Sequence, residues 1–370
     1  MQTRLPLAPF QLPGTSRMLA PRKVGTALVV TLTLVAAPLA AQDPYDRDPR
    51  IVIREQVRDV IRGPVTVRDG ARAYQGRDRG PEQTDRFSRK VRIGRDGRFT
   101  IENIAGDITI TAGTGDEVSI EAVKRSRGGR SQLDSVHILV DERPGRVEVK
   151  TDHTARNDRV AVDYTVTVPA STGVDAKSVS GSLKITGVQG VVRAETISGG
   201  ITTASTPKLE VAKSVSGDVD LTDATADSDL NASSVSGIIR ARGLKARTLD
   251  LGTVSGDVML SNIACTRLGV RSVSGSVEYS GTLAKSGRYE INSHSGTVRL
   301  SIGSDVGFEL SANSFSGSIR SELPMTLGPT SARNDRRRPG PGHSTHAVFG
   351  DGSAALVIRT FSGDIVITKR

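Results

Sequence analysis

A four-residue unit recurs through the second half of the chain: Ser or Thr, an apolar or aromatic residue, Ser and Gly. Successive glycines from Gly181 to Gly317 are 18 to 21 residues apart. A constant period of this length indicates short units that stack, because one such unit cannot bury an apolar face alone. The nine copies begin at Ser178, Thr196, Ser214, Ser234, Thr253, Ser272, Ser293, Ser314 and Thr360.

Two alternating patterns flank each glycine. Apolar residues alternate with polar ones before and after it, which is typical of a strand with one buried face. We therefore expect two short strands per repeat, with a bulge where Leu209 and Val211 fall out of step with the other copies. The second residue after each glycine is always aliphatic: Leu183, Ile201, Val219, Ile239, Val258, Val277, Val298, Ile319 and Ile365.

The repeat predicts an all-β fold: a single-chain β-solenoid (β-helix) of about nine to ten coils with an N-terminal β-hairpin-rich cap. We expect the glycine to relieve crowding at the bend between the strands. The serines are interpreted as structural, in ladders on either side of an inward apolar column that includes Val179. His294 replaces valine in that column, so we expect it to be partly exposed or bonded to neighbouring serines.

The first 41 residues have the organisation of a secretory signal peptide. They contain four bases and no acid, then an apolar run and a small-residue stretch that ends at Ala41. Without them the formal charge falls from +10 to +6, since 10 minus 4 is 6. We expect an exported protein, in the periplasm, on the outer cell surface or outside the cell. The mature form is expected to bind no nucleic acid and to have no transmembrane segment.

The remaining chain is divided into three parts. Residues 42–95 are expected to form a charged flexible linker. Residues 96–170 are expected to form an N-terminal β region that caps the solenoid. Residues 171–370 carry the solenoid repeats, with a basic Pro/Gly-rich loop inserted at 323–345. The last coil, from Ala354 to Lys369, is expected to close the stack.

Residues 98–370 resemble the bacterial putative adhesin family, exported β-strand-repeat domains of formerly unknown function. The resemblance lies in the segment from Asn103 to Ile108, in Val166 to Ala170, in the repeated Val-Ser-Gly-Asp/Ser-Val, and in Arg359 to Ile365. It implies a β-solenoid at the cell envelope with an adhesive or scaffolding role, and it brings no catalytic residues.

No catalytic, cofactor-binding or metal-binding residue is predicted, and no cofactor. Aspartate follows the glycine in only some repeats, whereas a calcium ladder needs oxygen ligands on every coil. His343 and His346 share the basic loop, and His137 and His153 lie on predicted strands without a ligand cluster. Four acids gather near one return loop, but there is no Trp for sugar stacking: Asp220, Asp223, Asp227 and Asp229.

Three hypotheses remain open for function. The first is a non-enzymatic, exported, adhesin-like β-solenoid that presents a binding surface to an envelope protein or polysaccharide. The second is a periplasmic scaffold or envelope-stress accessory protein that binds its partner through terminal strand edges. The third is a polysaccharide-cleaving β-helix enzyme. The partner and the oligomeric state are unknown from the sequence.

Overall fold

The computed structural model describes residues 81–154, 159–224, 229–303, 305–327 and 343–370. All of them belong to one unit, Arg77–Arg370, which is built almost entirely of strands. The expected signal peptide and most of the expected linker lie outside the described residues. The predicted all-β class is confirmed.

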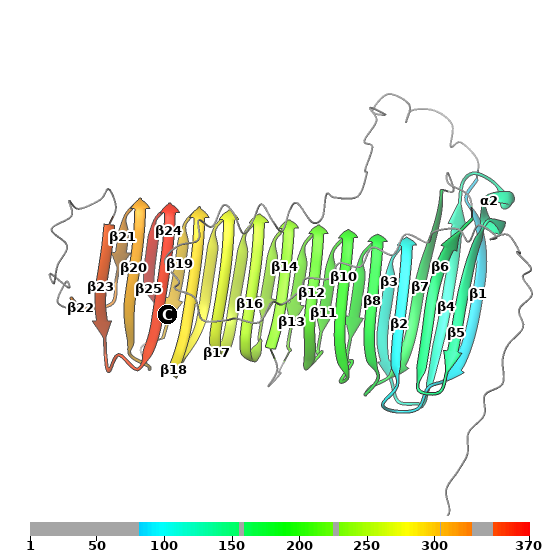
Figure 1. The fold of residues 1–370 in the computed structure, drawn as a ribbon, viewed down its shortest axis with the longest axis horizontal. Coiled ribbons are helices and arrows are strands. Elements are labelled where there is room, and N and C mark those ends of the chain that lie inside the picture. Colours follow the sequence, from blue (N-terminus) through cyan, green and yellow to red (C-terminus); the bar gives the residue numbers. More distant parts are fainter. Residues whose placement is uncertain (1–80, 155–158, 225–228, 304, 328–342) are drawn as a thin grey trace, which may run out of the picture. The chain divides into compact units, whose positions relative to one another are not determined.

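Each regular coil contains one strand before the glycine bend and one after it (Figure 1). Side chains alternate between buried and exposed along both strands, as the sequence pattern predicts. The strands before the bend include β8 (Gly173–Ser180), β10 (Val191–Ser198), β12 (Lys208–Ser216), β14 (Asp229–Ser236) and β16 (Lys245–Ser255). The strands after it include β9 (Leu183–Thr186), β11 (Ile201–Ala204), β13 (Val219–Thr222), β15 (Ile239–Arg242) and β19 (Val298–Ile302).

The coils stack in parallel, in two ladders. Strands before the bend pair with their counterparts in adjacent coils, and strands after it do the same, as in β8–β10–β12 and β9–β11–β13. Two long strands, β17 (Val258–Ser274) and β18 (Val277–Ser295), contribute to both ladders. The register shifts between Val192 and Arg193 against β12, which confirms the predicted bulge. This is a β-solenoid-like arrangement.

The interior is a set of aliphatic columns. Leu183, Val219, Val258 and Val298 are each at most 1% exposed and belong to one continuous core. Ile319, on the outermost coil, is the partly exposed member of this column. Stacking therefore buries the face that no single coil could bury, which confirms the main prediction from the repeat.

The glycines form a column in which backbones approach one another closely. A Cβ atom on Gly217 would lie 2.1 Å from the carbonyl oxygen of Gly199, and the φ of Gly217 is +152°. The same contact recurs at Gly256 against Gly237 and at Gly363 against Gly296. Only glycine satisfies both the spacing and the backbone conformation, so the column fixes the bend of every coil.

The Val179 column faces outward, which corrects the prediction that it points inward. Val179 is 45% exposed, whereas Ser178 is buried beside Ala176. Strand pairing joins Ser178 to Thr196 and Ser180 to Ser198 but omits the residue between them. Ser178 continues the inward parity of Val174 and Ala176, so Val179 lies on the outward face. The alternation breaks only after it, where Val179 and Ser180 are both exposed.

The N-terminal coil does not precede the others in space. Strands β2 (Arg98–Ala105) and β3 (Ile108–Gly113) lie between the later strands β6 (Arg146–His153) and β7 (Val160–Pro169) on one side and β8 and β9 on the other. Three antiparallel strands continue the ladders beyond these: β5 (Val136–Arg143) pairs with β6, β4 (Glu117–Ser126) pairs with β7, and β1 (Gln83–Arg92) pairs with β4. The five-residue helix α2 (Arg130–Asp134) connects β4 to β5.

Strand β1 corrects the boundary of the expected linker. It lies inside the interval 42–95, yet it pairs along its whole length with β4 and its Val91 is buried. Its polar residues at alternate positions, Arg86, Ser88, Lys90 and Arg92, are the exposed face of a strand, and Phe87 and Val91 lie on the other face.

The C-terminal coil is also out of sequence order. Strand β24 (Ala354–Ser362) lies between β18 and β20 (Phe308–Ser316), and β25 (Ile365–Lys369) lies between β19 and β21 (Ile319–Ser321). Backbone hydrogen bonds join Gly296 N to Ser362 O and Gly363 N to Ser316 O, each at 3.0 Å. The prediction that the last coil closes the stack is therefore wrong.

The chain passes outward before it returns to form the last coil. Strand β23 (His343–Phe349) pairs antiparallel with β20 and, on its other side, with the two-residue strand β22 (Thr326–Leu327). The described ends of the expected loop at 323–345 are thus partly strand, and 328–342 lie outside the described residues.

Candidate binding surface

The outward residues two positions before each glycine form one continuous line, which we call the ridge. Neighbouring positions on both sides pair in register from coil to coil, so these ten side chains lie above one another. Ten positions at the spacing of paired strands span about 43 Å. In stack order the ridge is Ile104, Val179, Ile197, Val215, Val235, Val254, Val273, His294, Phe361 and Phe315.

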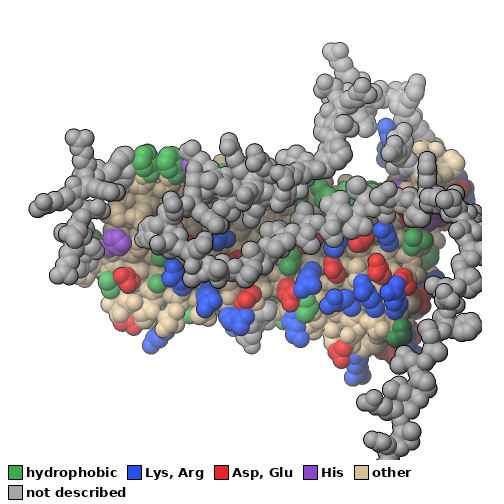
Figure 2. All heavy atoms as spheres, viewed as in Figure 1, with side chains coloured by type: hydrophobic (Ala, Val, Ile, Leu, Met, Phe, Trp, Pro, Cys, Tyr) green, Lys and Arg blue, Asp and Glu red, His purple; other side chains and the backbone are tan. Residues whose placement is uncertain are grey.

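Aromatic rings occupy the C-terminal end of the ridge. His294 stacks on Phe361 with ring centroids 4.9 Å apart, and Phe361 stacks on Phe315 at 4.8 Å. Phe315 and Phe361 are 47% and 44% exposed. Figure 2 shows hydrophobic side chains at the surface along the upper edge, towards the C-terminal coils. As expected, His294 is partly exposed.

Different charges lie on the two sides of the ridge. We call the residues four positions before each glycine the mixed flank. It includes four bases and two acids: Lys177, Lys213, Arg271 and Arg359 with Glu102 and Glu195. The residues directly after each glycine, here the acidic flank, include four aspartates and no base: Asp107, Asp218, Asp257 and Asp364.

The repeated serines are structural, as interpreted from the sequence. Ser214 Oγ donates a hydrogen bond to the carbonyl oxygen of Gly199 at 2.9 Å, and Ser234 Oγ donates to Gly217 O at 3.0 Å. In the first coil Asn103 takes this place, and its Nδ2 donates to Gly106 O and Val162 O. These hydroxyl and amide groups serve the glycine column rather than a reaction.

The aspartates of the acidic flank bind backbone amides of the next coil. Asp218 Oδ1 accepts a hydrogen bond from Ile238 N at 2.9 Å, and Asp364 Oδ1 accepts one from Ser318 N at 2.7 Å. These bonds, with Arg240 beside Asp218, lower the pKa of both carboxyl groups. The Gly-Asp pairs therefore have a structural partner that does not require calcium.

The structure does not bring the other sequence candidates together as a site. Asp220 lies 3.4 Å from Arg240, and Asp229 pairs with Arg247 at 3.1 Å. Asp227 lies outside the described residues. Among the described residues no group of three or more His, Cys, Asp or Glu could hold a metal ion. His137 is on β5 and His153 on β6, while His343 and His346 are on β23.

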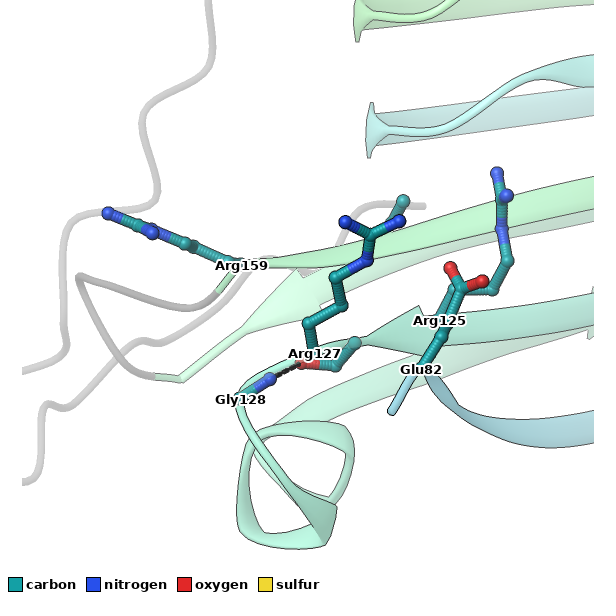
Figure 3. A pocket seen from close by; sticks show the side chains of 7 residues that line it. Glu82, Arg125, Arg127, Gly128 and Arg159 are labelled. Atoms are coloured by element: carbon teal, nitrogen blue, oxygen red, sulfur yellow. Dashed lines mark hydrogen bonds between the residues drawn. The ribbon is translucent and has the colours of Figure 1, made fainter. Parts of the chain in front are cut away.

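Two shallow depressions hollow the described surface. One, of about 240 Å³, lies on the N-terminal strands and is lined by three arginines and Glu82. Glu82, Arg125 and Arg127 point to the same side, whereas Arg159 points away (Figure 3). Arg125 already pairs with Asp163 at 2.5 Å.

The second depression, of about 280 Å³, lies on the outer side of the strands that follow the bend. Its Arg240 and Arg299 pair with carboxylates of their own chain. Neither gathers a set of groups arranged for catalysis.

The ridge was missed as a surface by the sequence reasoning. The available signal was parity: Val174, Ala176 and Ser178 continue one alternation, so Val179 lies on the other face. The hydrophobicity of Val179 and its counterparts favoured the inward face instead.

A family model described as Toastrack DUF4097 matches residues 98–368. No curated protein matches the chain. Among solved structures, a putative adhesin from Bacteroides fragilis is 14% identical, with 76% of this chain and 97% of that chain covered and a TM-score of 0.41. A putative lipid binding protein from Parabacteroides distasonis is 9% identical, with 77% and 97% covered and a TM-score of 0.38. A putative adhesin from Parabacteroides merdae is 11% identical, with 76% and 95% covered and a TM-score of 0.32.

Proposed function

Because the chain belongs to the Toastrack DUF4097 family, we propose that it is an exported, non-enzymatic, adhesin-like β-solenoid. In this proposal its nine to ten coils present a binding surface at the cell envelope to a protein or polysaccharide. Its location is the periplasm, the outer cell surface or the extracellular space. The mature chain has no transmembrane segment in this proposal; in the described part of the chain no helix is long and apolar enough to cross a bilayer.

The ridge is the observation that supports binding. Exposed apolar side chains are ordinary when scattered, but a contiguous line of them favours an interaction surface. The two exposed phenylalanines are of the residue class that anchors protein interfaces. The ridge is continuous, and two hydrogen-bonded ladders hold the strands beneath it in place. Such a surface is suited to binding a partner rather than to catalysis.

The test is binding of the labelled mature protein to envelope fractions from its own cells. Substitutions Val235→Lys and Phe361→Ser on the ridge should reduce binding at least tenfold. Leu139→Lys on β5 is the matched control, because Leu139 is 51% exposed and lies off the ridge. If all three variants are folded and bind as the unaltered protein does, the ridge is not the binding surface.

Location needs a separate measurement. A membrane-impermeant amine label applied to intact cells should modify the protein if it is displayed outside. Labelling only after the envelope is opened would place it in the periplasm, and recovery of the unprocessed chain in the cytoplasm would contradict export.

A further inference from the structure

We propose that the partner of the ridge is the ridge of a second copy of this chain, with the two stacks face to face and parallel. This inference rests on the proposed function, because it names the partner of the same surface. It adds a symmetric dimer in which each ridge residue lies near its own counterpart across a twofold axis.

The repeat spacing of the ridge favours a second copy. Ten side chains follow one another at the spacing of paired strands, about 4.8 Å. An extended peptide laid along the ridge would present side chains on one face only about every 7 Å, so it would match few of the ten positions. A second ridge has the same spacing by construction and matches over the full length.

The aromatic end fits a parallel arrangement. In a parallel pair Phe361 and Phe315 of one copy meet the same residues of the other, so four exposed phenyl rings are removed from water at one end. In an antiparallel pair those rings would face Ile104 and Val179 instead. Aromatic pairs add contact energy beyond the area that they bury.

The flanking charges also select the parallel orientation. A twofold axis along the stack places the mixed flank of each copy against the acidic flank of the other. Lys213 then faces the partner's Asp218, and Arg359 faces the partner's Asp364. An antiparallel pair would set one acidic flank against the other, with four carboxylates on each side.

These charges orient the pair more than they strengthen it. Asp218 already lies 2.8 Å from Arg240, and Arg359 lies 3.0 Å from Glu290 in the same chain. Charges at the rim of an interface mainly determine register and association rate, and the apolar centre supplies most of the affinity. The first coil is the exception to complementarity, because Glu102 would face the partner's Asp107.

The first experiment measures the mass of the mature protein in solution over a hundredfold concentration range by sedimentation. The expected result is a dimer that Val235→Lys converts to monomer, with at least a tenfold weaker association. Leu139→Lys should associate as the unaltered protein does. A monomer at all concentrations, or a dimer equally stable in Val235→Lys, overturns the proposal.

The second experiment determines orientation by disulfide formation. Val179→Cys lies near one end of the ridge and Phe361→Cys near the other, and the native Cys265 is buried. In a parallel dimer each variant alone should form a cross-linked dimer under mild oxidation. Cross-linking only in a mixture of the two variants would show an antiparallel pair and overturn the proposed orientation.

The two proposals fail separately. If ridge variants lose binding to the envelope while the unaltered protein stays monomeric, the binding surface stands and the self-partner is wrong. If ridge variants lose neither binding nor association, both are wrong.

Discussion

At the scale of single residues, each member of the repeated unit has a distinct physical task. In four copies the first Ser or Thr donates to a glycine carbonyl in the adjacent coil, as Ser214 does to Gly199, and the glycine allows the close approach of two bends. Where aspartate follows, its carboxylate accepts an amide of the next coil. The motif therefore forms contacts between coils, and these polar groups bind the protein's own backbone.

Replacing one glycine of the column should be costly. In Gly217→Ala the new methyl group would meet the Gly199 carbonyl at 2.1 Å, and φ would have to remain near +152°. We expect the free energy of unfolding to fall by at least about 2 kcal/mol. Gly115→Ala is the control, because the nearest atom would be 3.8 Å away. Urea unfolding of both variants measures the difference, and similar midpoints would contradict the explanation.

The aspartate contacts should make stability depend on pH. The pKa of Asp364 is lowered by hydrogen bonds from the Ser318 amide and hydroxyl, so the folded value lies below the unfolded value of about 3.9. This stabilisation is present above the unfolded pKa and is lost as pH falls through the folded pKa. Asp364→Ala should therefore be less stable than the unaltered protein at pH 7, and the difference between the two should be smaller at pH 2.

Urea unfolding at both pH values tests this prediction. Asp134→Ala on α2 serves as the comparison, because Asp134 lies outside the coil ladders. A difference between Asp364→Ala and the unaltered protein that is the same at both pH values would show that the charge of Asp364 is not involved.

At the scale of strands, the two faces of each coil predict opposite responses to the same substitution. Val258 is fully buried, whereas Val235 is 36% exposed on the ridge. Val258→Asp places an unpaired carboxylate in the core and should prevent folding of the array or destabilise it by several kcal/mol, roughly 4 or more. Val235→Asp should change stability by less than about 1 kcal/mol. Circular dichroism with thermal unfolding distinguishes them, and a folded Val258→Asp would mean that the column is not dry.

The strands show what could be read from the sequence. The inward columns were predicted because period-two alternation is a local property of each strand. The direction of Val179 was mispredicted because its hydrophobicity was given more weight than its parity, although Val174, Ala176 and Ser178 already place it on the opposite face of the strand. The bulge near Leu209 was found because it disturbs the alternation itself.

At the scale of the whole unit, the order of the coils could not be predicted. Every coil has the same local pattern, so nothing in the residues from Ala354 to Lys369 states which neighbours they will join. The segment between β21 and β24 is long enough for the chain to pass outward and return. Family membership, by contrast, was read correctly from the motifs, since the predicted adhesin resemblance spans almost the same residues as the family match.

Removal of residues 354–370 tests this order. Because β24 and β25 lie between two other coils, their loss should expose the edges of β18 and β19 and separate β20 and β21 from the stack. Amide hydrogen exchange should increase in Phe308–Ser321 and in the facing edge of β18, and remain slow in β10 to β15. Continued protection of Phe308–Ser316 would indicate that this coil does not depend on the last one.

The interleaved ends also limit how such a molecule can change its length in evolution. Between β10 and β15 the coils stack in the same order as they occur in the sequence, so a coil duplicated there would lie next to its neighbours in the chain. A coil appended after Arg370 would find its neighbours' edges already occupied on both sides. Lineages of this chain should therefore vary in copy number internally, while the segments that form both ends are inherited as fixed units.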